Sequence, residues 1–360
     1  MNPTVTIAIP TYNEEKHIGK VIRCFLNSSY PEIIEIIIAD GRSNDNTRQI
    51  VEGLIFEDSR IKLLDNRLRI QSAALQLMSQ VSKGDIFLRV DAHCEYAPDY
   101  VERCVEALQY SGSLNVGGAQ RFLAKNPFQL AVALASRSPL GSGKAKYRNP
   151  NYTGYADTVF LGCFWLKALL EVGGYYLTRK EDTELNLRLL DKNTQAIYIC
   201  SSIKVWYFPR SNWKALWNQY VKYGRGCCLI NRRYPNKLPK RSNLPFHCLV
   251  INLLLFIVNW ASFRNLSYIV SLDAMIVILC IIEAIQINVK FYDSCKDEFW
   301  RGENSQFPSF LKRCSLCWVV LTTIPIAHAW GYTQQLFRIH ILKIDENYFL
   351  ESGYELEKTP

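Results

Sequence analysis

The stretch Ile86-Phe87-Leu88-Arg89-Val90-Asp91-Ala92-His93 decides how the first half of this chain folds and where its chemistry lies. Its apolar part predicts a buried strand, and Asp91 and His93 follow where that strand ends. Alternate residues of an extended chain point the same way, so a carboxylate and an imidazole at this spacing can share one divalent ion. For an isolated Asp-x-His, the simpler interpretation is a loop Asp that caps the next helix beside a solvated His.

Strand-like runs alternate with helix-like stretches through the first 110 residues. We expect strands over 5–9, 33–39, 61–64 and 85–90, and helices over 16–26, 46–55, 70–81 and 100–110. Such alternation predicts a mostly parallel sheet that binds its ligands beyond the carboxyl ends of the strands. The polar segment Thr11 to Glu14, Asp40 and Asp91 all fall at that edge. No Gly-x-Gly-x-x-Gly follows these strands, which argues against a dinucleotide site.

Two further motifs place carboxylates where a ligand could meet them. Asp40 opens a turn in which Ser43 or Asp45 can cap the next helix, and Asp40 itself is left to bond a uracil ring or a ribose. Glu181 has a structural alternative, because Thr178-x-x-Glu181 has the pattern of a capping box. That arrangement leaves Asp182 free to face a cleft as a general base.

The second half of the chain contains three apolar runs, over 244–263, 266–288 and 314–331, of about membrane-spanning length. Asp273 and Glu283 lie in the middle run, and in a true span they should face other helices. A buried helix hairpin of a large soluble domain is the alternative.

Basic residues are concentrated immediately before the first apolar run. The segment from Ile203 to Arg241 contains ten Lys or Arg residues and no Asp or Glu, whereas the whole chain has a formal net charge of +9. This block predicts contact with anionic headgroups on the cytoplasmic side of a membrane. Nucleic-acid binding is the competing interpretation, which we do not favour because no nucleic-acid module accompanies the block.

The compartment is indicated by the start of the chain and by its cysteines. The first residues form a strand-like run without the basic and longer apolar regions of a signal peptide, so we expect the first 200 residues to stay cytosolic. The twelve cysteines have no regular spacing, which favours a reducing compartment over a disulfide framework. The segment Ser136 to Asn151, rich in Ser, Gly, Pro, Lys and Arg, predicts a mobile loop over the sheet edge.

These motifs, in this order, resemble the inverting glycosyltransferases of family 2. The matching segments are Pro10 to Glu14, Asp40 to Thr47, Asp91 to His93, Gly117-Gly118 and Glu181-Asp182, within about the first 230 residues. The resemblance implies the GT-A nucleotide-diphospho-sugar transferase fold, a Rossmann-like mixed α/β sheet flanked by helices, here with a C-terminal helical membrane region. Arg89 to Ala97, Tyr207 to Ser211 and Tyr223 to Gly226 are similar to the membrane-anchored glucosyltransferases of the succinoglycan type.

The resemblance implies roles for individual residues. Those expected to bind the nucleotide-sugar are Pro10, Tyr12, Glu14, Asp40, Arg69 and Asp91, with Arg69 near the diphosphate. Asp91 and His93 would hold Mg²⁺ or Mn²⁺. In this chain His93 replaces the second Asp of the usual Asp-x-Asp, and Trp206 and Tyr207 stand where many relatives have a later His ligand.

The implied reaction moves a sugar from a nucleotide-diphospho-sugar, with a UDP-sugar favoured, to a hydroxyl of a lipid-linked or oligosaccharide acceptor at the membrane. Asp182 would take the proton of the acceptor hydroxyl, with Glu181 beside it, and the anomeric carbon would be inverted. Such an enzyme would serve exopolysaccharide or cell-surface glycan synthesis. The alternatives are a processive polysaccharide synthase and a non-catalytic membrane scaffold that retains the fold.

The segment Ser211 to Gly226 predicts an amphipathic helix with an aromatic side and a basic side. Such a helix can lie in a bilayer interface, and an ordinary packing helix is the alternative. Gln219-x-x-Lys222-Tyr223 distantly resembles the Gln-x-x-Arg-Trp acceptor motif of processive synthases. The expected acceptor-binding residues are therefore Gln219, Lys222, Tyr223 and Arg225.

We therefore expect four parts along the chain. They are a GT-A catalytic domain over 1–205, a basic interfacial segment over 206–241, membrane helices over 242–332 and a C-terminal tail over 333–360.

Overall fold

The computed structural model describes residues 2–142, 145–261, 267–293 and 295–343. Their backbone contacts divide the chain into two compact units, which are considered separately. Of the described residues, unit 1 takes those up to 121 and from 149 to 207, and unit 2 takes 122–148 and those from 208 to 343. The first unit thus ends close to the expected boundary at 205, but the segment 122–148 belongs to unit 2.

Unit 1 is built on a mixed sheet of eight strands with the order β3-β2-β1-β4-β9-β6-β10-β8. These strands are β1 (Val5–Thr11), β2 (Ile33–Asp40), β3 (Ile61–Asp65), β4 (Ile86–Arg89), β6 (Asn115–Gly118), β8 (Gly154–Tyr155), β9 (Phe160–Trp165) and β10 (Ile197–Ile199). The strands β3, β2, β1 and β4 run parallel, as the alternating pattern predicts. A second sheet has the order β5-β11-β7, formed by β5 (Cys94–Tyr96), β11 (Val205–Tyr207) and β7 (Gln120–Phe122).

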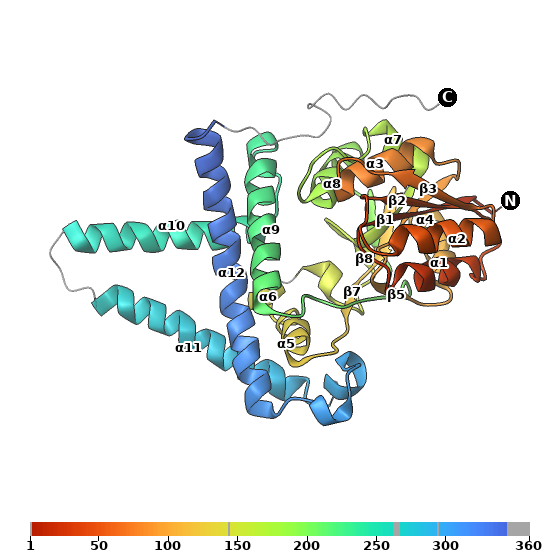
Figure 1. Cartoon of the computed structure of the whole chain (residues 1–360). Coiled ribbons are helices and arrows are strands. Elements are labelled where there is room, and N and C mark those ends of the chain that lie inside the picture. Colours follow the sequence, from red (N-terminus) through yellow and green to blue (C-terminus); the bar gives the residue numbers. More distant parts are fainter. Residues whose placement is uncertain (1, 143–144, 262–266, 294, 344–360) are drawn as a thin grey trace. The chain divides into compact units, whose positions relative to one another are not determined.

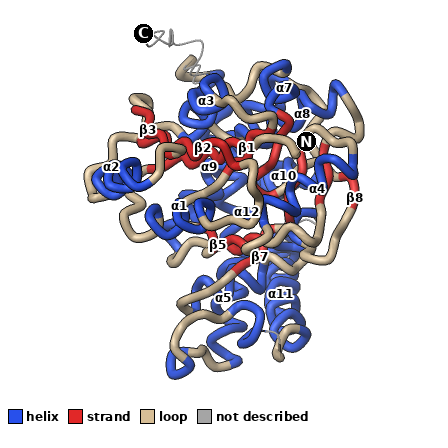
Figure 2. The backbone as a smooth tube through the Cα atoms, turned by 90° about the vertical axis from the view of Figure 1, so that its right-hand side faces the viewer, coloured by secondary structure: helices blue, strands red, loops and turns tan. Residues whose placement is uncertain are grey.

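Helices cover both faces of the large sheet (Figures 1 and 2). They are α1 (Ile18–Leu26), α2 (Thr47–Glu57), α3 (Gln71–Val81), α4 (Tyr100–Ser111), α7 (Leu166–Glu171) and α8 (Glu181–Lys192). In both views α3 lies on one face of β1 and β2, and α1 and α2 lie on the other. The four expected strands and four expected helices are all present, and the α/β prediction is confirmed.

The spacing of apolar residues explains this layering. Every residue of β1 except Pro10 is buried, because a central strand with helices on both faces has no solvent side. In α1 the buried residues are Ile18, Val21, Ile22 and Phe25, which follow the helical repeat and form one stripe. The ring of Phe25 lies 6.4 Å from that of Tyr100, which joins α1 to α4 on this face of the sheet.

The antiparallel strand β9 lies between β4 and β6 and makes the sheet mixed. Gly117 and Gly118 of β6 permit this close packing. A Cβ at Gly117 would lie 2.9 Å from the carbonyl oxygen of Phe160, and one at Gly118 would lie 2.1 Å from that of Ile203. Glycine is therefore required at both positions of the Gly117-Gly118 pair, because neighbouring backbones approach them closely.

Unit 2 is helical. Its helices are α5 (Pro127–Ala135), α6 (Pro139–Ser142), α9 (Trp213–Arg233), α10 (Lys240–Ala261), α11 (Ser267–Lys290) and α12 (Phe310–His340). The helices α9 and α12 run side by side (Figure 1). The loop expected over 136–151 instead contains α6 and a 3₁₀ turn at Lys146–Arg148, while residues 143–144 of that segment lie outside the described residues.

The three apolar runs form α10, α11 and α12. Two stretches, Lys240–Val258 and Phe310–His340, are long and apolar enough to cross a membrane by length and composition, and α11 does not meet this criterion over the described residues. The acid Asp273 accepts a 2.7 Å hydrogen bond from Asn252, and Glu283 accepts one from Ser138. The predicted start of the C-terminal tail at residue 333 is too early, because α12 continues to His340. The rest of the predicted tail from 344 to 360 lies outside the described residues. All twelve cysteines are free thiols.

Candidate active site

A cleft of about 200 Å³ opens in unit 1 at the carboxyl ends of the parallel strands. Thr11 of β1 pairs with Asp40 of β2, and Ala8 pairs with Arg89 of β4, so the three strand ends meet at one edge. The cleft is lined by Pro10, Thr11, Tyr12, Glu14, Gly41, Asn66, Arg69, Gln71, Asp91, Ala92 and His93. Six of the predicted ligand residues are among them, and Asn66 and Gln71 are additions to the predicted set.

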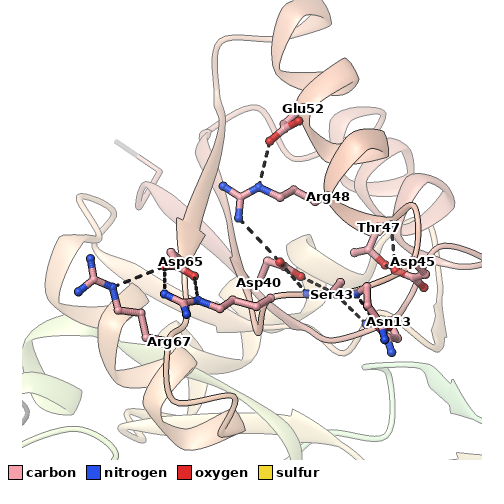
Figure 3. Close-up of polar contacts among 11 residues, drawn as sticks. Asn13, Asp40, Ser43, Asp45, Thr47, Arg48, Glu52, Asp65 and Arg67 are labelled. Carbon is pink, nitrogen blue, oxygen red and sulfur yellow. Dashed lines mark hydrogen bonds and ion pairs between the residues drawn. The ribbon is translucent and has the colours of Figure 1, made fainter.

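Hydrogen bonds join the loop after β1 to the loop after β2 (Figure 3). The amide of Asn13 donates to Ser43 Oγ at 2.8 Å, and the side chain of Asn13 accepts from the amide of Asn44 at 3.0 Å. The amide of Glu14 donates to Thr47 Oγ1 at 2.7 Å. These bonds hold two cleft-lining residues at fixed positions, Glu14 and Tyr12, of which Tyr12 is 51% exposed.

Asp40 is fully buried behind this edge. Its carboxylate accepts hydrogen bonds from the hydroxyl of Ser43 at 2.6 Å and from the amide of Ser43 at 3.1 Å. Its neighbour Gly41 lines the cleft, whereas Asp40 does not. In this structure Asp40 therefore braces the loop, and its contact with the nucleoside stays a prediction. The N-cap residue of α2 is Asn46, which makes no side-chain cap bond, and Asp45 just before it accepts from the amide of Thr47, the first helical residue, at 3.0 Å.

Glu14 lies between two histidines. One carboxylate oxygen is 3.2 Å from Nδ1 of His93, and the other is 3.0 Å from Nδ1 of His17. Burial raises the pKa of Glu14, but the hydrogen bonds and charges of His93 and His17 outweigh burial and leave the pKa lowered. An ionised Glu14 thus orients the His93 ring, in the arrangement by which a carboxylate positions an imidazole for metal binding.

Asp91 stands at the end of β4, mostly buried. Its backbone is held by Tyr96, whose hydroxyl accepts from the Asp91 amide at 2.8 Å and donates to the Asp91 carbonyl at 3.0 Å. Its carboxylate lies 3.4 Å from Nε2 of Gln71 and 3.5 Å from Nε of Arg89. The side chain is thereby directed to the floor of the cleft, where a substrate phosphate or a metal ion could reach it.

A buried arginine outside the predicted site residues connects Asp91 to the candidate base. Arg89 is only 5% exposed and forms an ion pair with Asp182, with Glu181 Oε1 at 3.8 Å. Three carboxylates thus surround one guanidinium. Burial, followed by the charge of Asp182, raises the pKa of Glu181 to about 7. Burial also raises the pKa of Asp182, against the lowering effect of Arg89.

The capping-box alternative for Glu181 is wrong. The helix α8 begins at Glu181, and its N-cap residue is Lys180, which has a φ of 54° and makes no side-chain cap bond. Glu181 is therefore the first helical residue rather than the third. Its carboxylate turns toward Arg89 with that of Asp182, whose side chain is 39% exposed. Neither carboxylate is used to cap the helix, so both can take part in proton transfer.

The residues at the cleft fit a divalent ion. Mg²⁺ and Mn²⁺ favour carboxylate oxygens and complete their shells with water and substrate phosphates. Asp91 and His93 line the same cleft, and the acids around Arg89 exceed its charge. Over the described residues no group of three His, Cys, Asp or Glu side chains could hold an ion, so substrate oxygens would have to complete the shell.

The expected acceptor residues lie on α9 of unit 2. Gln219 donates to the hydroxyl of Tyr223 at 3.0 Å, and Lys222 is exposed. Arg225 is not on an exposed basic face as expected, because its Nε donates to Gln335 of α12 at 2.9 Å. Leu216 is buried as well. The packing of α9 on α12 thus supports the interpretation of α9 as a packing helix.

The fold and the cleft define a glycosyltransferase of the GT-A class. A family model described as glycosyl transferase family 2 matches residues 6–168. The chain is also 36% identical over 261 residues to the succinoglycan biosynthesis protein ExoA of Rhizobium meliloti (strain 1021), with 71% of this chain and 78% of the relative covered. This chain therefore belongs to glycosyl transferase family 2.

One further relative and one solved structure are also similar to this chain. The dolichyl N-acetyl-alpha-D-glucosaminyl phosphate 3-beta-D-2,3-diacetamido-2,3-dideoxy-beta-D-glucuronosyltransferase of Methanococcus voltae is 28% identical over 241 residues, which cover 64% of this chain and 74% of that protein. The structure of the mannosyltransferase PcManGT from Pyrobaculum calidifontis, in complex with GDP-Man and Mn²⁺, has a TM-score of 0.56 at 14% identity. That alignment covers 94% of this chain and 88% of the other, and it supports the fold alone.

Proposed function

We propose that this protein is an inverting glycosyltransferase that moves a sugar from a nucleotide-diphospho-sugar to a hydroxyl of a lipid-linked or oligosaccharide acceptor. The observation that carries the proposal is the ion pair of Arg89 with Asp182, which connects a candidate base to the strand that bears Asp91. A non-catalytic scaffold has no need to bury an arginine among three acids, because buried charges are costly to maintain.

The donor binds in the strand-end cleft. Tyr12 offers a flat ring for the base, with a UDP-sugar favoured, and Arg69 offers positive charge for the diphosphate. Arg69 has a φ of 56°, which its neighbours must stabilise and which directs this side chain at the cleft. Asp91, with His93 beside it, would hold Mg²⁺ or Mn²⁺, which when bound would supply positive charge against the departing diphosphate.

The acceptor hydroxyl loses its proton to Asp182. The raised pKa of Asp182 makes it a better base than an ordinary aspartate, and Arg89 keeps the carboxylate in place until the acceptor arrives. Attack on the anomeric carbon from the side opposite the diphosphate inverts that carbon in one step. Glu181 remains a neighbouring acid whose charge adjusts the pKa of the pair.

Unit 2 and the names of the relatives support the proposed acceptor and location. The names of two relatives refer to succinoglycan biosynthesis and to a dolichyl phosphate sugar, which suggests exopolysaccharide or cell-surface glycan synthesis on a lipid carrier. Exposed apolar side chains cover α10 from Leu249 to Val258 and suit a bilayer. The basic residues before α10 support a catalytic unit on the cytoplasmic face.

The test is to incubate the purified full chain with a panel of nucleotide sugars and either Mn²⁺ or Mg²⁺, and to measure release of the nucleoside diphosphate. Release that requires a metal and disappears in Asp182→Asn supports the enzyme, whereas no release from any donor with any acceptor supports the scaffold. The length of the product separates single transfer from the processive alternative.

A further inference from the structure

The two helices of unit 2 that are long and apolar enough to cross a membrane differ in their packing. No residue in the most apolar stretch of α10 is buried inside the protein, whereas 39% of the corresponding stretch of α12 is buried. The helix α12 contacts α5, α9, α10 and α11, and its polar residues Thr323, His328 and Gln335 are buried. This helix is therefore the central packing element of unit 2.

The helices α10 and α11 expose apolar side chains on all sides. In α10 the five consecutive residues from Leu253 to Ile257 are exposed, and in α11 the five from Met275 to Leu279 are exposed. Five consecutive residues cover more than one turn of an α-helix, so they point to every side of it. A helix that is apolar all round is typical of a protein core or of a membrane span, and neither stretch lies in a core.

The opposite ends of both helices are fixed to the rest of unit 2. Near the start of α10, the ring of Phe246 is stacked 4.2 Å from that of Tyr332 of α12. Near the end of α11, Asn288 is fully buried and accepts a hydrogen bond from Arg313 of α12 at 3.2 Å. The exposed stretches of the two helices therefore extend away from one helical base, on the same side of α12 (Figure 1).

The two acids of α11 do not prevent its entry into hydrocarbon, because each has a polar partner. Asp273 accepts a 2.7 Å hydrogen bond from Asn252 of α10, and this bond also joins the two helices. Glu283 accepts a hydrogen bond from Ser138, which lies between α5 and α6. Ionisable side chains within membrane spans are paired with polar groups in this way.

Three features indicate that a lipid bilayer, and not a partner protein, surrounds the exposed stretches. A protein partner covers one face of a helix, whereas lipid chains surround it. The apolar stretch Lys240–Val258 has 19 residues, or about 28 Å of helix, close to the thickness of about 30 Å of the hydrocarbon core. The basic segment 203–241, without Asp or Glu, precedes α10, and α11 ends at Lys290, so the base of the two helices suits anionic headgroups.

We propose that α10 and α11 enter the bilayer together as a hairpin from one side, and that α12 stays outside the hydrocarbon with α9. Two membrane helices then replace the three that the sequence predicts, and the residues before α10 and after α11 stay on the same side. The hairpin keeps the protein at the surface where a lipid-linked acceptor lies. The inference goes beyond the proposed function, because insertion does not require sugar transfer.

The test measures how much of the full chain, reconstituted from detergent, floats with vesicles of phosphatidylglycerol and phosphatidylethanolamine in a density gradient. Ile251→Lys in α10 and Ile276→Lys in α11 should each lower the vesicle partition constant by about 10- to 100-fold, because a charge must then enter the hydrocarbon. Ile326→Lys in α12 is the matched control, since this isoleucine is 58% exposed, against 56% for Ile251 and 48% for Ile276. It should change the partition constant less than twofold.

A second measurement uses the wild type alone. A lipid-soluble diazirine reacts with side chains that contact hydrocarbon, so in the same vesicles it should label residues 249–258 and 275–279. Ile326 and Trp330, which are exposed on α12, should stay unlabelled. This measurement decides the proposal if a lysine variant does not fold, judged by its thermal unfolding midpoint in detergent.

Each other outcome has a definite meaning. A loss of vesicle binding in Ile326→Lys equal to that in the hairpin variants, or label on α12, shows that α12 also crosses and refutes the hairpin. Unchanged partition of both hairpin variants removes α10 and α11 from the bilayer. A wild type that does not float but sediments as a dimer, which Ile251→Lys dissociates, assigns the apolar surface to a second copy of the chain. Protein that floats as expected but transfers no sugar refutes the proposed function and leaves the hairpin in place.

Discussion

The guanidinium of Arg89 donates to the carboxylate of Asp182 across 93 residues of sequence. Arg89 is the last residue of β4, and Asp182 lies in the first turn of α8. The same guanidinium is 3.5 Å from Asp91, so one buried side chain connects the candidate base to the candidate metal ligand. The separation between the candidate base and the candidate metal ligand is therefore set by a buried core residue that contacts both, and not by a loop.

Asp182→Asn should reduce sugar transfer by roughly 10²- to 10⁴-fold, because the amide cannot take a proton. Donor binding should persist, since Asp182 does not line the donor cleft. Steady-state transfer and nucleotide-sugar titration on the same preparation measure the two effects. Asp191→Asn, an exposed position on the same helix, is the control and should transfer at the wild-type rate. Donor binding lost in parallel with activity would refute the assigned role.

The pH profile of kcat/KM should reflect the acids around Arg89. Glu181 has a pKa of about 7, and burial raises the pKa of Asp182. Since a general base must be deprotonated, activity should begin to fall at a higher pH than the range of ordinary aspartates as the pH is lowered. A flat profile from pH 8 down to 5 contradicts this assignment.

Arg89→Gln should move this acid limb to higher pH. The charge of Arg89 lowers the pKa of both Glu181 and Asp182, so its removal leaves both acids protonated at a higher pH than in the wild type. Arg89→Lys keeps the charge and should leave the limb closer to its original position. A shift to lower pH in Arg89→Gln is incompatible with the electrostatic role.

Measurements of metal binding can test the two predicted ligands, Asp91 and His93, separately. Asp91→Asn should abolish Mn²⁺ binding measured by electron paramagnetic resonance in the presence of nucleoside diphosphate. His93→Ala should weaken it by about tenfold to a hundredfold if the imidazole is a ligand oriented by Glu14. His17→Ala is the control, because His17 contacts the same carboxylate but does not line the cleft. Equal Mn²⁺ affinity in His93→Ala and the wild type removes His93 from the ligand set.

Gly224→Ala should destabilise unit 2. A Cβ at this position of α9 would lie 1.9 Å from the carbonyl oxygen of His328 in α12, so the two helices must separate. We expect a loss of about 1–3 kcal/mol, seen as a lower thermal unfolding midpoint. Gly53→Ala in α2 meets no atom within 4 Å and should leave the midpoint unchanged or raise it. Equal midpoints for the two variants contradict close packing of α9 on α12.

The parallel half of the sheet follows from local sequence. Runs such as Ile33 to Ala39 are apolar on both faces and separated by amphipathic helices, and that pattern permits few other folds. The position of β9 does not follow, because its antiparallel pairing with β4 and β6 depends on contacts with residues more than 40 positions earlier. The same holds for residues 122–148, which the sequence predicts to lie in the catalytic domain over 1–205 and which belong to unit 2.

The sequence by itself determined the fold family, the strand-end edge and its acidic and imidazole residues, because a strand ends where its apolar run ends and parallel strands end together. Only the tertiary structure decided which of those residues face the cleft. Asp40 turns inward to Ser43, and Glu181 leaves its expected cap for Arg89. The partners of a side chain come from distant segments, and a pattern along one segment contains no information about them. Arg89 gained its importance in this way.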